Sequence, residues 1–325
     1  MPVEIFSAEK ELSRMAKVAY VFPGQGAQTV EMVRDLYDNI SASREVIDAA
    51  KDIIGEDLVN LMFDDPTGEL NKTKNAQPLI LIASLAILVG YLDHYPTLRK
   101  ILPRLVFGHS LGELIALVVA GVLSFEDGVK IAKIRGEVMT SAPPGRMAAV
   151  RNIPQDKLNY ILSAFQIDIG VINSDTQIVL SGEEKAMDQA LTYLTSQNIK
   201  ARPLPISIAS HSRVMQAVQP QFASVLDAFP FHNSRTPVIS VFEAQILEEG
   251  SAIKTAFIEQ MTHTLDFPLM LSTARQLGVD TFVEFGPKGL SRDGIVSGNI
   301  QALDPSLTAF NIRDLLTIKE RPLSF

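Results

Sequence analysis

Residues 105–119 read LVFGHSLGELIALVV, and this stretch decides the fold. Residues 105–107 are typical of a short buried strand, and residues 111–120 are typical of a buried helix that follows almost without a loop. Two glycines flank Ser110 in the pattern G-x-S-x-G. A strand, a tight turn and a helix in this order present a serine hydroxyl above the end of a sheet, so the pattern predicts a nucleophile elbow. An ordinary glycine-rich turn is the alternative.

The flanking sequence alternates short apolar runs with longer helical patterns, which predicts an α/β fold with a largely parallel sheet. Residues 78–92 indicate a buried helix opened by Pro78 at its first turn, and Ser124 starts a helix that runs to about Thr140. The expected strands outside the middle of the chain are Lys17–Phe22, Leu105–Phe107, Val238–Phe242 and Thr281–Phe285.

Residues 144–206 follow a different rhythm and predict a small inserted domain. Strands are expected at 146–151, 168–173, 176–181 and 199–204, with helices at 154–165 and 183–197. The resulting order, βαββαβ, is the split pattern of ferredoxin-like domains. We therefore expect a large α/β domain formed by residues 1–143 and 207–325, interrupted by this insert.

Composition excludes several classes of protein. The 325 residues include 46% hydrophobic residues and no cysteine, which removes disulfide scaffolds, thiolate metal sites and cysteine nucleophiles. A net charge of −8 argues against sequence-independent nucleic-acid binding. The first fourteen residues lack the apolar core of a signal peptide, and the 14-residue apolar run Leu79–Leu92 is shorter than the roughly 20 residues that cross a membrane. We expect a cytoplasmic, monomeric protein without metal or cofactor.

A serine nucleophile needs a base, and the chain offers five histidines. His211 lies in ISIASHSR (206–213), where an extended apolar run gives way to a helix, and this junction suits an imidazole held over a serine. A helix-capping role is the alternative. The other four lack such support, because one adjoins the serine on the elbow and the rest have no local pattern: His94, His109, His232 and His263.

Two further features point to serine acyl chemistry. PGQGAQ (23–28) fails as a dinucleotide fingerprint, because Thr29 stands in place of the third glycine. Its backbone amide at Gln25, together with that of Leu111, would instead form an oxyanion hole; a plain tight turn is the alternative. Arg135 lies among apolar residues of its helix and needs an anionic partner. That partner is either Glu113 or Glu137, or a substrate carboxylate held by the guanidinium.

Seven motifs together resemble the malonyl-CoA:acyl-carrier-protein transacylases and the acyltransferases of polyketide synthases, including stand-alone ones. They occur in family order over residues 17–300: VFPGQGAQ (21–28), Gln77-Pro78, GHSLGE (108–113), RGEVM (135–139), GRMAAV (145–150), IASHS (208–212) and EFGP (284–287). The resemblance implies an α/β-hydrolase-like large domain with a ferredoxin-like insert, in agreement with the pattern above.

The resemblance also implies roles for individual residues. Ser110 is implied as the nucleophile, His211 as its base, and Arg135 as the ligand of the malonyl carboxylate. The other implied roles are backbone amides of the oxyanion hole at Gln25 and Leu111, a carbonyl that orients the histidine at Gln260, and pocket positions at Gln77 and Met139. Three stretches depart from the family pattern and leave the acyl-group choice open: Ser240–Glu243, Lys288 and Ile208–His211.

The leading functional hypothesis is a ping-pong transfer of a malonyl-type group from CoA to the phosphopantetheine thiol of an acyl carrier protein, in fatty acid or polyketide synthesis. A hydrolase that strips acyl groups from carriers is the alternative enzyme, and a carrier-docking scaffold is a non-enzymatic one. Arg135 separates the first two, because a simple esterase has no use for it. Lys200, Arg202 and Lys288 are candidates for docking the carrier or CoA, against the alternative that they are scattered surface charges.

Overall fold

A six-stranded sheet in the order β10-β9-β4-β2-β12-β13 forms the centre of the protein, whose computed structural model describes residues 3, 5–6 and 13–323. All neighbouring strands are parallel except the antiparallel edge pair β9–β10. The strands are β2 (Val18–Phe22), β4 (Leu105–Gly108), β9 (Val238–Ile239), β10 (Ile246–Leu247), β12 (Thr281–Phe285) and β13 (Thr308–Ile312). The predicted α/β fold with a largely parallel sheet is thus confirmed. The ends of the expected large domain, residues 1–2 and 324–325, lie outside the described residues.

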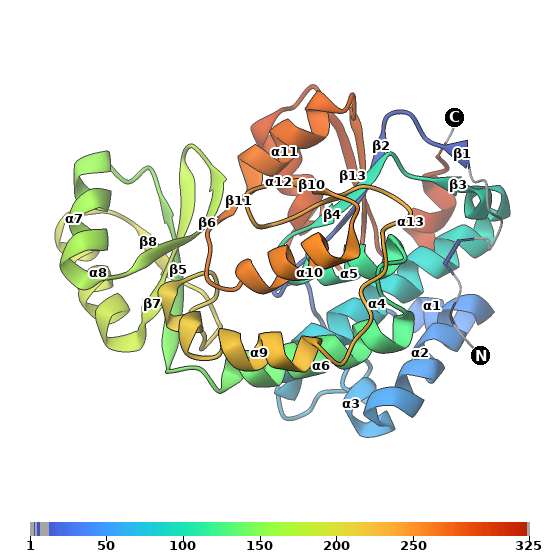
Figure 1. The fold of residues 1–325 in the computed structure, drawn as a ribbon, viewed down its shortest axis with the longest axis horizontal. Coiled ribbons are helices and arrows are strands. Elements are labelled where there is room, and N and C mark those ends of the chain that lie inside the picture. The colour runs from blue at the N-terminus through green and yellow to red at the C-terminus, as the bar shows by residue number, and fades with distance from the viewer. Residues whose placement is uncertain (1–2, 4, 7–12, 324–325) are drawn as a thin grey trace.

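Helices cover both faces of this sheet, as buried parallel strands require (Figure 1). In the first half of the chain they are α1 (Arg34–Asn39), α2 (Ser41–Ile54), α3 (Glu56–Asn60), α4 (Thr73–His94), α5 (Leu111–Val119) and α6 (Phe125–Thr140). Later ones are α9 (Gln219–Leu226), α10 (Gly250–Glu259), α11 (Phe267–Gln276), α12 (Ile295–Leu303) and α13 (Leu315–Glu320). Short 3₁₀ turns occur at Glu69–Asn71, Pro96–Lys100 and Arg213–Ala217, and a two-stranded parallel pair joins β1 (Ser13–Arg14) to β3 (Ile101–Leu102).

Helix α4 begins five residues earlier than the sequence predicts, so Pro78 lies inside the helix. Tertiary contacts hold the turn before the proline: Asn75 donates to the Glu69 carbonyl at 2.9 Å, and Gly136 of α6 packs directly on the Lys74 backbone. Among the described helices, α4 alone is long and apolar enough to cross a membrane, but 94% of its apolar window is buried inside the protein. It is the core helix around which α2 and α6 pack.

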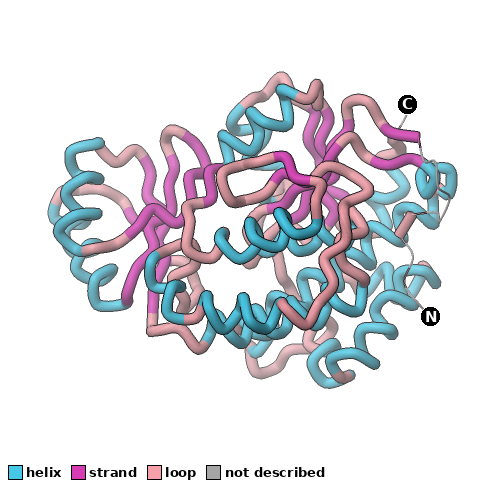
Figure 2. Tube along the Cα trace, in the orientation of Figure 1, coloured by secondary structure: helices cyan, strands magenta, loops and turns pink. Residues whose placement is uncertain are grey.

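A second sheet, in the order β11-β6-β7-β5-β8, stands beside the first (Figures 1 and 2). Its elements are β5 (Gly145–Arg151), α7 (Gln155–Phe165), β6 (Asp168–Ser174), β7 (Gln177–Glu183), α8 (Glu184–Ser196), β8 (Ala201–Pro203) and β11 (Leu265–Asp266). One face packs on α7 and α8 through residues such as Ala148, Leu180 and Met187. The opposite face carries Met147 and Val179 and packs toward the large sheet.

Strand β9 is shorter than the predicted strand Val238–Phe242. The backbone N–H of Ser240 donates to the Gln245 carbonyl at 2.9 Å, and the Ser240 hydroxyl accepts from the Phe242 N–H at 3.0 Å. Glu243 and Ala244 then adopt left-handed φ angles of 57° and 50°. These contacts turn the chain back into β10, which the apolar pattern alone does not reveal.

Candidate active site

Ser110 lies on a strained turn between β4 and α5, with φ 54° and ψ −107°. The turn is possible because its neighbours are glycines. A Cβ on Gly108 would lie 2.0 Å from the backbone of Gly112, and one on Gly112 would lie 2.2 Å from the Phe22 carbonyl oxygen. The start of α5 therefore packs directly against β2 and β4, and the predicted strand–turn–helix is confirmed.

His211 faces Ser110, with its Nε2 atom 2.8 Å from Oγ. Its Nδ1 atom lies 2.8 Å from the carbonyl oxygen of Gln260 and 3.2 Å from that of His263. Carbonyls only accept, so Nδ1 carries the proton and Nε2 is left to accept from the Ser110 hydroxyl. Burial, reinforced by the charge of Arg135, lowers the pKa of His211 to about 3. The imidazole is therefore neutral at physiological pH, as a general base must be.

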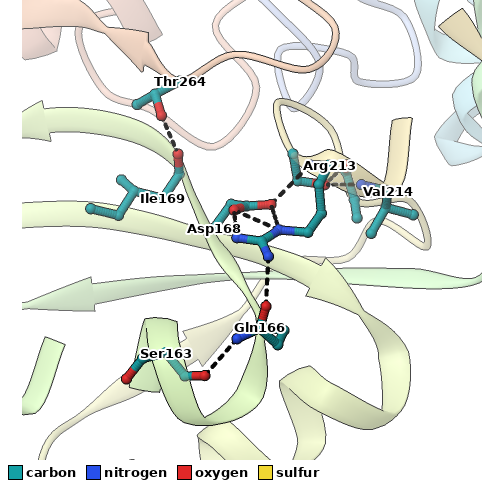
Figure 3. A network of polar contacts seen from close by, with 9 residues as sticks. Ser163, Gln166, Asp168, Ile169, Arg213, Val214 and Thr264 are labelled. Carbon is teal, nitrogen blue, oxygen red and sulfur yellow. Dashed lines mark hydrogen bonds and ion pairs between the residues drawn. The ribbon is translucent and has the colours of Figure 1, made fainter. Parts of the chain in front are cut away.

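The segment around His211 is fixed to the second sheet (Figure 3). The Arg213 side chain and backbone N–H both donate to the Asp168 carboxylate on β6, at 2.7–3.1 Å, and Arg213 also reaches Gln166. Thr264, just after His263, donates to the Ile169 carbonyl at 2.7 Å. His211 itself has a left-handed φ of 57°, a conformation that such flanking contacts hold in place.

The amides predicted for an oxyanion hole lie at the same place. Gln25 and Leu111 both line a cavity of about 270 Å³ that contains Ser110 and His211. Within the described residues, neither backbone N–H has a hydrogen-bond acceptor. The Gln25 side chain donates to Thr73 at 3.1 Å, which fixes the loop that carries its amide.

Arg135 is 1% exposed and lines the same cavity. Its Nη1 donates to Oε1 of Gln77 at 2.8 Å, while Nε and Nη2 are buried without a hydrogen-bond partner. Burial lowers its pKa to about 10, so the guanidinium stays charged at neutral pH. Glu113, one of the two predicted partners, stabilises the charge of Arg135 electrostatically. Within the described residues it accepts no hydrogen bond from Arg135 and accepts instead from Gln260 and Val241. Glu137 pairs with Lys133.

Other residues of the cavity were not identified from the sequence. His109 is half-buried beside the serine, where desolvation lowers its pKa to about 4, and its ring interacts with Asn173 of β6. Asn173 in turn accepts from Asn299 of α12 at 3.4 Å. The uncovered face of the second sheet supplies an apolar wall formed by Met147, Ala149, Val171 and Val179. One signal for Asn173 was present in the sequence, a polar residue on the otherwise apolar cavity face of β6. No signal in the sequence pointed to Asn299.

The remaining predicted residues lie at the margin or outside the cavity. Met139 is buried behind Gln77, whose amide points to its sulfur at 3.4 Å, and it is not among the described residues that line the cavity. Lys200 and Arg202 are exposed and Lys288 is half-buried, all three outside that lining. A larger cavity of about 670 Å³ lies elsewhere, around Ile5, Ile53 and Phe125, and has no serine–histidine pair.

A serine on a strand–helix elbow, hydrogen-bonded to a buried histidine, is the arrangement that serine enzymes of the acyl-transfer class use. Residues 19–306 match the family model described as an acyl transferase domain. The chain therefore belongs to the acyl transferase family, among the malonyl CoA-acyl carrier protein transacylases.

The relatives support this assignment over nearly the whole chain. The malonyl CoA-acyl carrier protein transacylase of Staphylococcus aureus strain MRSA252 is 34% identical, over 94% of this chain and 98% of the relative. The crystal structure of the corresponding enzyme from Xanthomonas oryzae superposes with a TM-score of 0.86 at 30% identity, covering 94% and 97% of the two chains. A malonyl-transacylase solved in complex with a type II polyketide synthase acyl-carrier protein gives a TM-score of 0.84 at 28% identity, covering 93% and 98%.

Proposed function

We propose that this enzyme moves a malonyl-type group from CoA to the phosphopantetheine thiol of an acyl carrier protein through an ester on Ser110. The observation that carries the proposal is the charged, buried Arg135, with two nitrogen atoms unpartnered in the cavity wall that holds Ser110. Glu113 acts on this charge without a hydrogen bond to it, so two buried donors remain unpaired, which is costly. A substrate carboxylate would supply their acceptor. A malonyl thioester carries such a carboxylate, whereas an acetyl thioester does not.

In the first half-reaction, His211 Nε2 takes the Ser110 proton as Oγ attacks the thioester carbonyl. The oxyanion that forms accepts from the amides of Gln25 and Leu111. The C–S bond then breaks, His211 returns the proton to the CoA thiolate, and malonyl remains as an ester on Ser110. The 2.8 Å Oγ–Nε2 contact supports this direct proton transfer.

In the second half-reaction, the carrier's thiol gives its proton to His211 and attacks the Ser110 ester. The C–O bond breaks, and Oγ recovers the proton. The apolar wall of the cavity supports this order of events, because it shields the ester from water until the thiol arrives. Gln260 acts through its carbonyl on Nδ1 of the histidine, and Gln77 orients Arg135.

The position of Arg202 on β8 supports a docking role for this residue and for Lys200, which directly precedes the strand. Arg202 pairs directly with Ala149 across the antiparallel strands β8 and β5. Directly paired residues point to the same face of a sheet, and Ala149 lines the cavity. Lys288 follows β12 on a loop whose Gly289 packs on Gly26, next to Gln25. These three cations would face the carrier or the CoA phosphates, in fatty acid or polyketide synthesis in the cytoplasm.

For the architecture, we propose that residues 1–143 and 207–325 form an α/β-hydrolase-like domain and 144–206 a ferredoxin-like insert. The strand order β6-β7-β5-β8, antiparallel throughout, supports the insert, because βαββαβ units of this kind place their first and third strands at the centre. Both helices of the unit cover one face. The other face is then free to close the cavity.

Intact-protein mass spectrometry tests the function. Incubation with malonyl-CoA alone should add one malonyl group, and later addition of a holo carrier protein should move that group to the carrier. Ser110→Ala should remain unmodified under the same conditions. Release of free malonate at the same rate without a carrier would instead identify the hydrolase, which the comparisons do not favour.

A further inference from the structure

Glu113 is a buried carboxylate close to the reacting groups, three residues after Ser110 on α5, and the acyl-transfer steps above do not use it. It is 1% exposed, and its Oε2 atom accepts from Gln260 Nε2 at 2.8 Å and from the Val241 N–H at 3.3 Å. Burial raises its pKa to about 7, and the charge of Arg135 partly opposes that rise. Among the described residues no Lys, Arg or His side chain lies within ion-pair distance of it. A carboxylate kept in such a place needs a structural reason, because its burial is unfavourable.

Gln260 connects this carboxylate to the histidine. The residue is fully buried and follows the last turn of α10, where a helix leaves its final carbonyls without intrahelical partners. Its carbonyl accepts from His211 Nδ1 at 2.8 Å, while its side chain donates to Glu113 at 2.8 Å. Gln260 therefore contacts both reacting groups' supports: its backbone carbonyl bonds to His211, and its side chain bonds to Glu113 on the helix that follows Ser110.

These contacts close a ring. It runs from Ser110 Oγ to His211, from His211 to Gln260, from Gln260 to Glu113, and back through the Glu113 N–H, which donates to the Ser110 carbonyl at 3.0 Å. The second acceptor of Nδ1 is the carbonyl of His263, and this residue also contacts the segment that Glu113 holds. Phe242, next to Val241, packs its ring at 4.7 Å from the His263 ring centre.

We propose that Glu113 is a positioning residue: by holding the Gln260 side chain and the Val241 backbone, it fixes the carbonyls that aim His211 at Ser110. The carbonyl of Gln260 accepts from Nδ1, as the acid of a hydrolase triad does elsewhere, and Glu113 acts one residue further from the imidazole. The proposal rests on the proposed function for the identity of the acyl group, and on the Ser110–His211 pair alone for its mechanism.

Four variants test the ring. Glu113→Ala and Gln260→Ala should each lower the single-turnover acylation rate constant about 10–100-fold, with KM for malonyl-CoA changed less than about threefold. The double variant should be no worse than either single one, because both break the same connection. Glu113→Gln keeps an oxygen that accepts from Gln260 and should retain activity to within about threefold. Ile47→Ala, a buried substitution in α2, controls for lost stability and should keep the rate constant.

Two further readouts separate this role from a merely structural one. The rate of Ser110 labelling by a fluorophosphonate needs the activated serine but no malonyl recognition, so it should fall in parallel even if malonyl-CoA proves the wrong donor. The hydrogen-bonded Nδ1 proton of His211, followed by ¹⁵N-histidine NMR, should be lost or shifted in Glu113→Ala and kept in Glu113→Gln. Wild-type labelling by Glu113→Ala, or additive losses in the double variant, would overturn the proposal.

Discussion

Gln77 accepts a 2.8 Å hydrogen bond from Nη1 of Arg135 through a side chain that is itself buried in α4. This contact uses one end of the guanidinium and leaves Nε and Nη2 for a ligand. The N–H groups of Nε and Nη2 point in parallel from one edge of the guanidinium, and their spacing matches the two oxygens of a carboxylate. The pairing of α4 with α6 therefore holds two unpartnered donors in a defined orientation.

Removal of that site should change the acyl preference. Arg135→Ala is expected to lower kcat/KM for malonyl-CoA about 10–100-fold, because a hydrogen bond to a charged group is lost, and to raise acetyl-CoA use relative to malonyl-CoA. Competition between the two donors, read by mass spectrometry of the acyl-enzyme, measures the ratio. Lys133→Ala, an exposed change on the same helix, is the control. An unchanged malonyl preference would make Arg135 a structural residue.

The base can be tested against the other histidines. His211→Ala should slow acylation of Ser110 by about 10²–10⁴, the usual contribution of a positioned general base. His94→Ala and His232→Ala alter exposed side chains and should leave the rate within about twofold of wild type. Pre-steady-state release of CoA measures the step. An equal loss in either control variant would show that the wrong histidine was chosen.

The pH dependence of acylation follows from the buried state of His211. A protonated imidazole cannot accept the Ser110 proton, so activity falls as pH approaches the histidine pKa from above. Because burial lowers that pKa to about 3, the neutral form persists well below the ordinary value of 6.5. We expect kcat/KM for malonyl-CoA to change less than about threefold between pH 7.5 and pH 5, where an ordinary histidine would cost about 30-fold. A tenfold loss for each unit below pH 6.5 would contradict this.

Sequence reasoning succeeded where short-range rules determine the structure. The elbow at Ser110 follows from two glycines between an apolar strand and an apolar helix, and β12 has the predicted bounds Thr281–Phe285. His211 was chosen by elimination among five histidines and by its position at a strand–helix junction, and its Nε2 atom lies 2.8 Å from Ser110 Oγ. The assignment of the chain to the transacylases, expected from seven motifs, is confirmed by relatives that match along nearly its full length.

The features that could not be predicted from the sequence depend mainly on contacts between distant parts of the chain. Pro78 predicts a helix start, but Gly136 of the later helix α6 packs on the backbone of an earlier turn, which Asn75 also joins to Glu69. The sequence suggested Glu113 as a partner for Arg135. Only the folded chain shows that Glu113 accepts a hydrogen bond from the side chain of Gln260, 147 positions later. The pocket positions His109, Asn173 and Asn299 come together from three separate elements, and no spacing rule relates them.

The contact between Asp168 and Arg213 should matter for rate more than for binding. Asp168→Ala removes the acceptor that anchors the residue two positions after His211, so we expect a severalfold lower acylation rate constant, of about 3–10-fold, with KM nearly unchanged. Arg146→Ala breaks an ion pair of similar exposure between β5 and Glu184, away from His211, and is the matched control. Equal effects of the two variants would assign the Asp168 effect to general loosening of the second sheet.

Carrier docking makes the last prediction, because an acidic enzyme needs a local basic surface to meet an acidic carrier protein. Neither Lys200 nor Arg202 forms an ion pair within the described residues, and Arg202 lies on the cavity face of its sheet. Lys200→Glu with Arg202→Glu should therefore slow transfer to the carrier about tenfold at low salt, with a smaller loss at high salt as screening increases.

The matched control for that pair reverses two charges on the opposite face. Lys157→Glu with Lys185→Glu changes the net charge equally, but both residues lie on α7 and α8, which cover the side of the sheet away from the cavity. Acylation by malonyl-CoA and transfer to the carrier are measured separately as half-reactions. If both double variants slowed transfer to the carrier by a similar factor, the cause would be the change in net charge and not the position of Lys200 and Arg202. An equal loss in both half-reactions of the Lys200–Arg202 variant would refute a dock that is specific to the carrier. A loss confined to the first half-reaction would assign these cations to CoA, since CoA enters only that step.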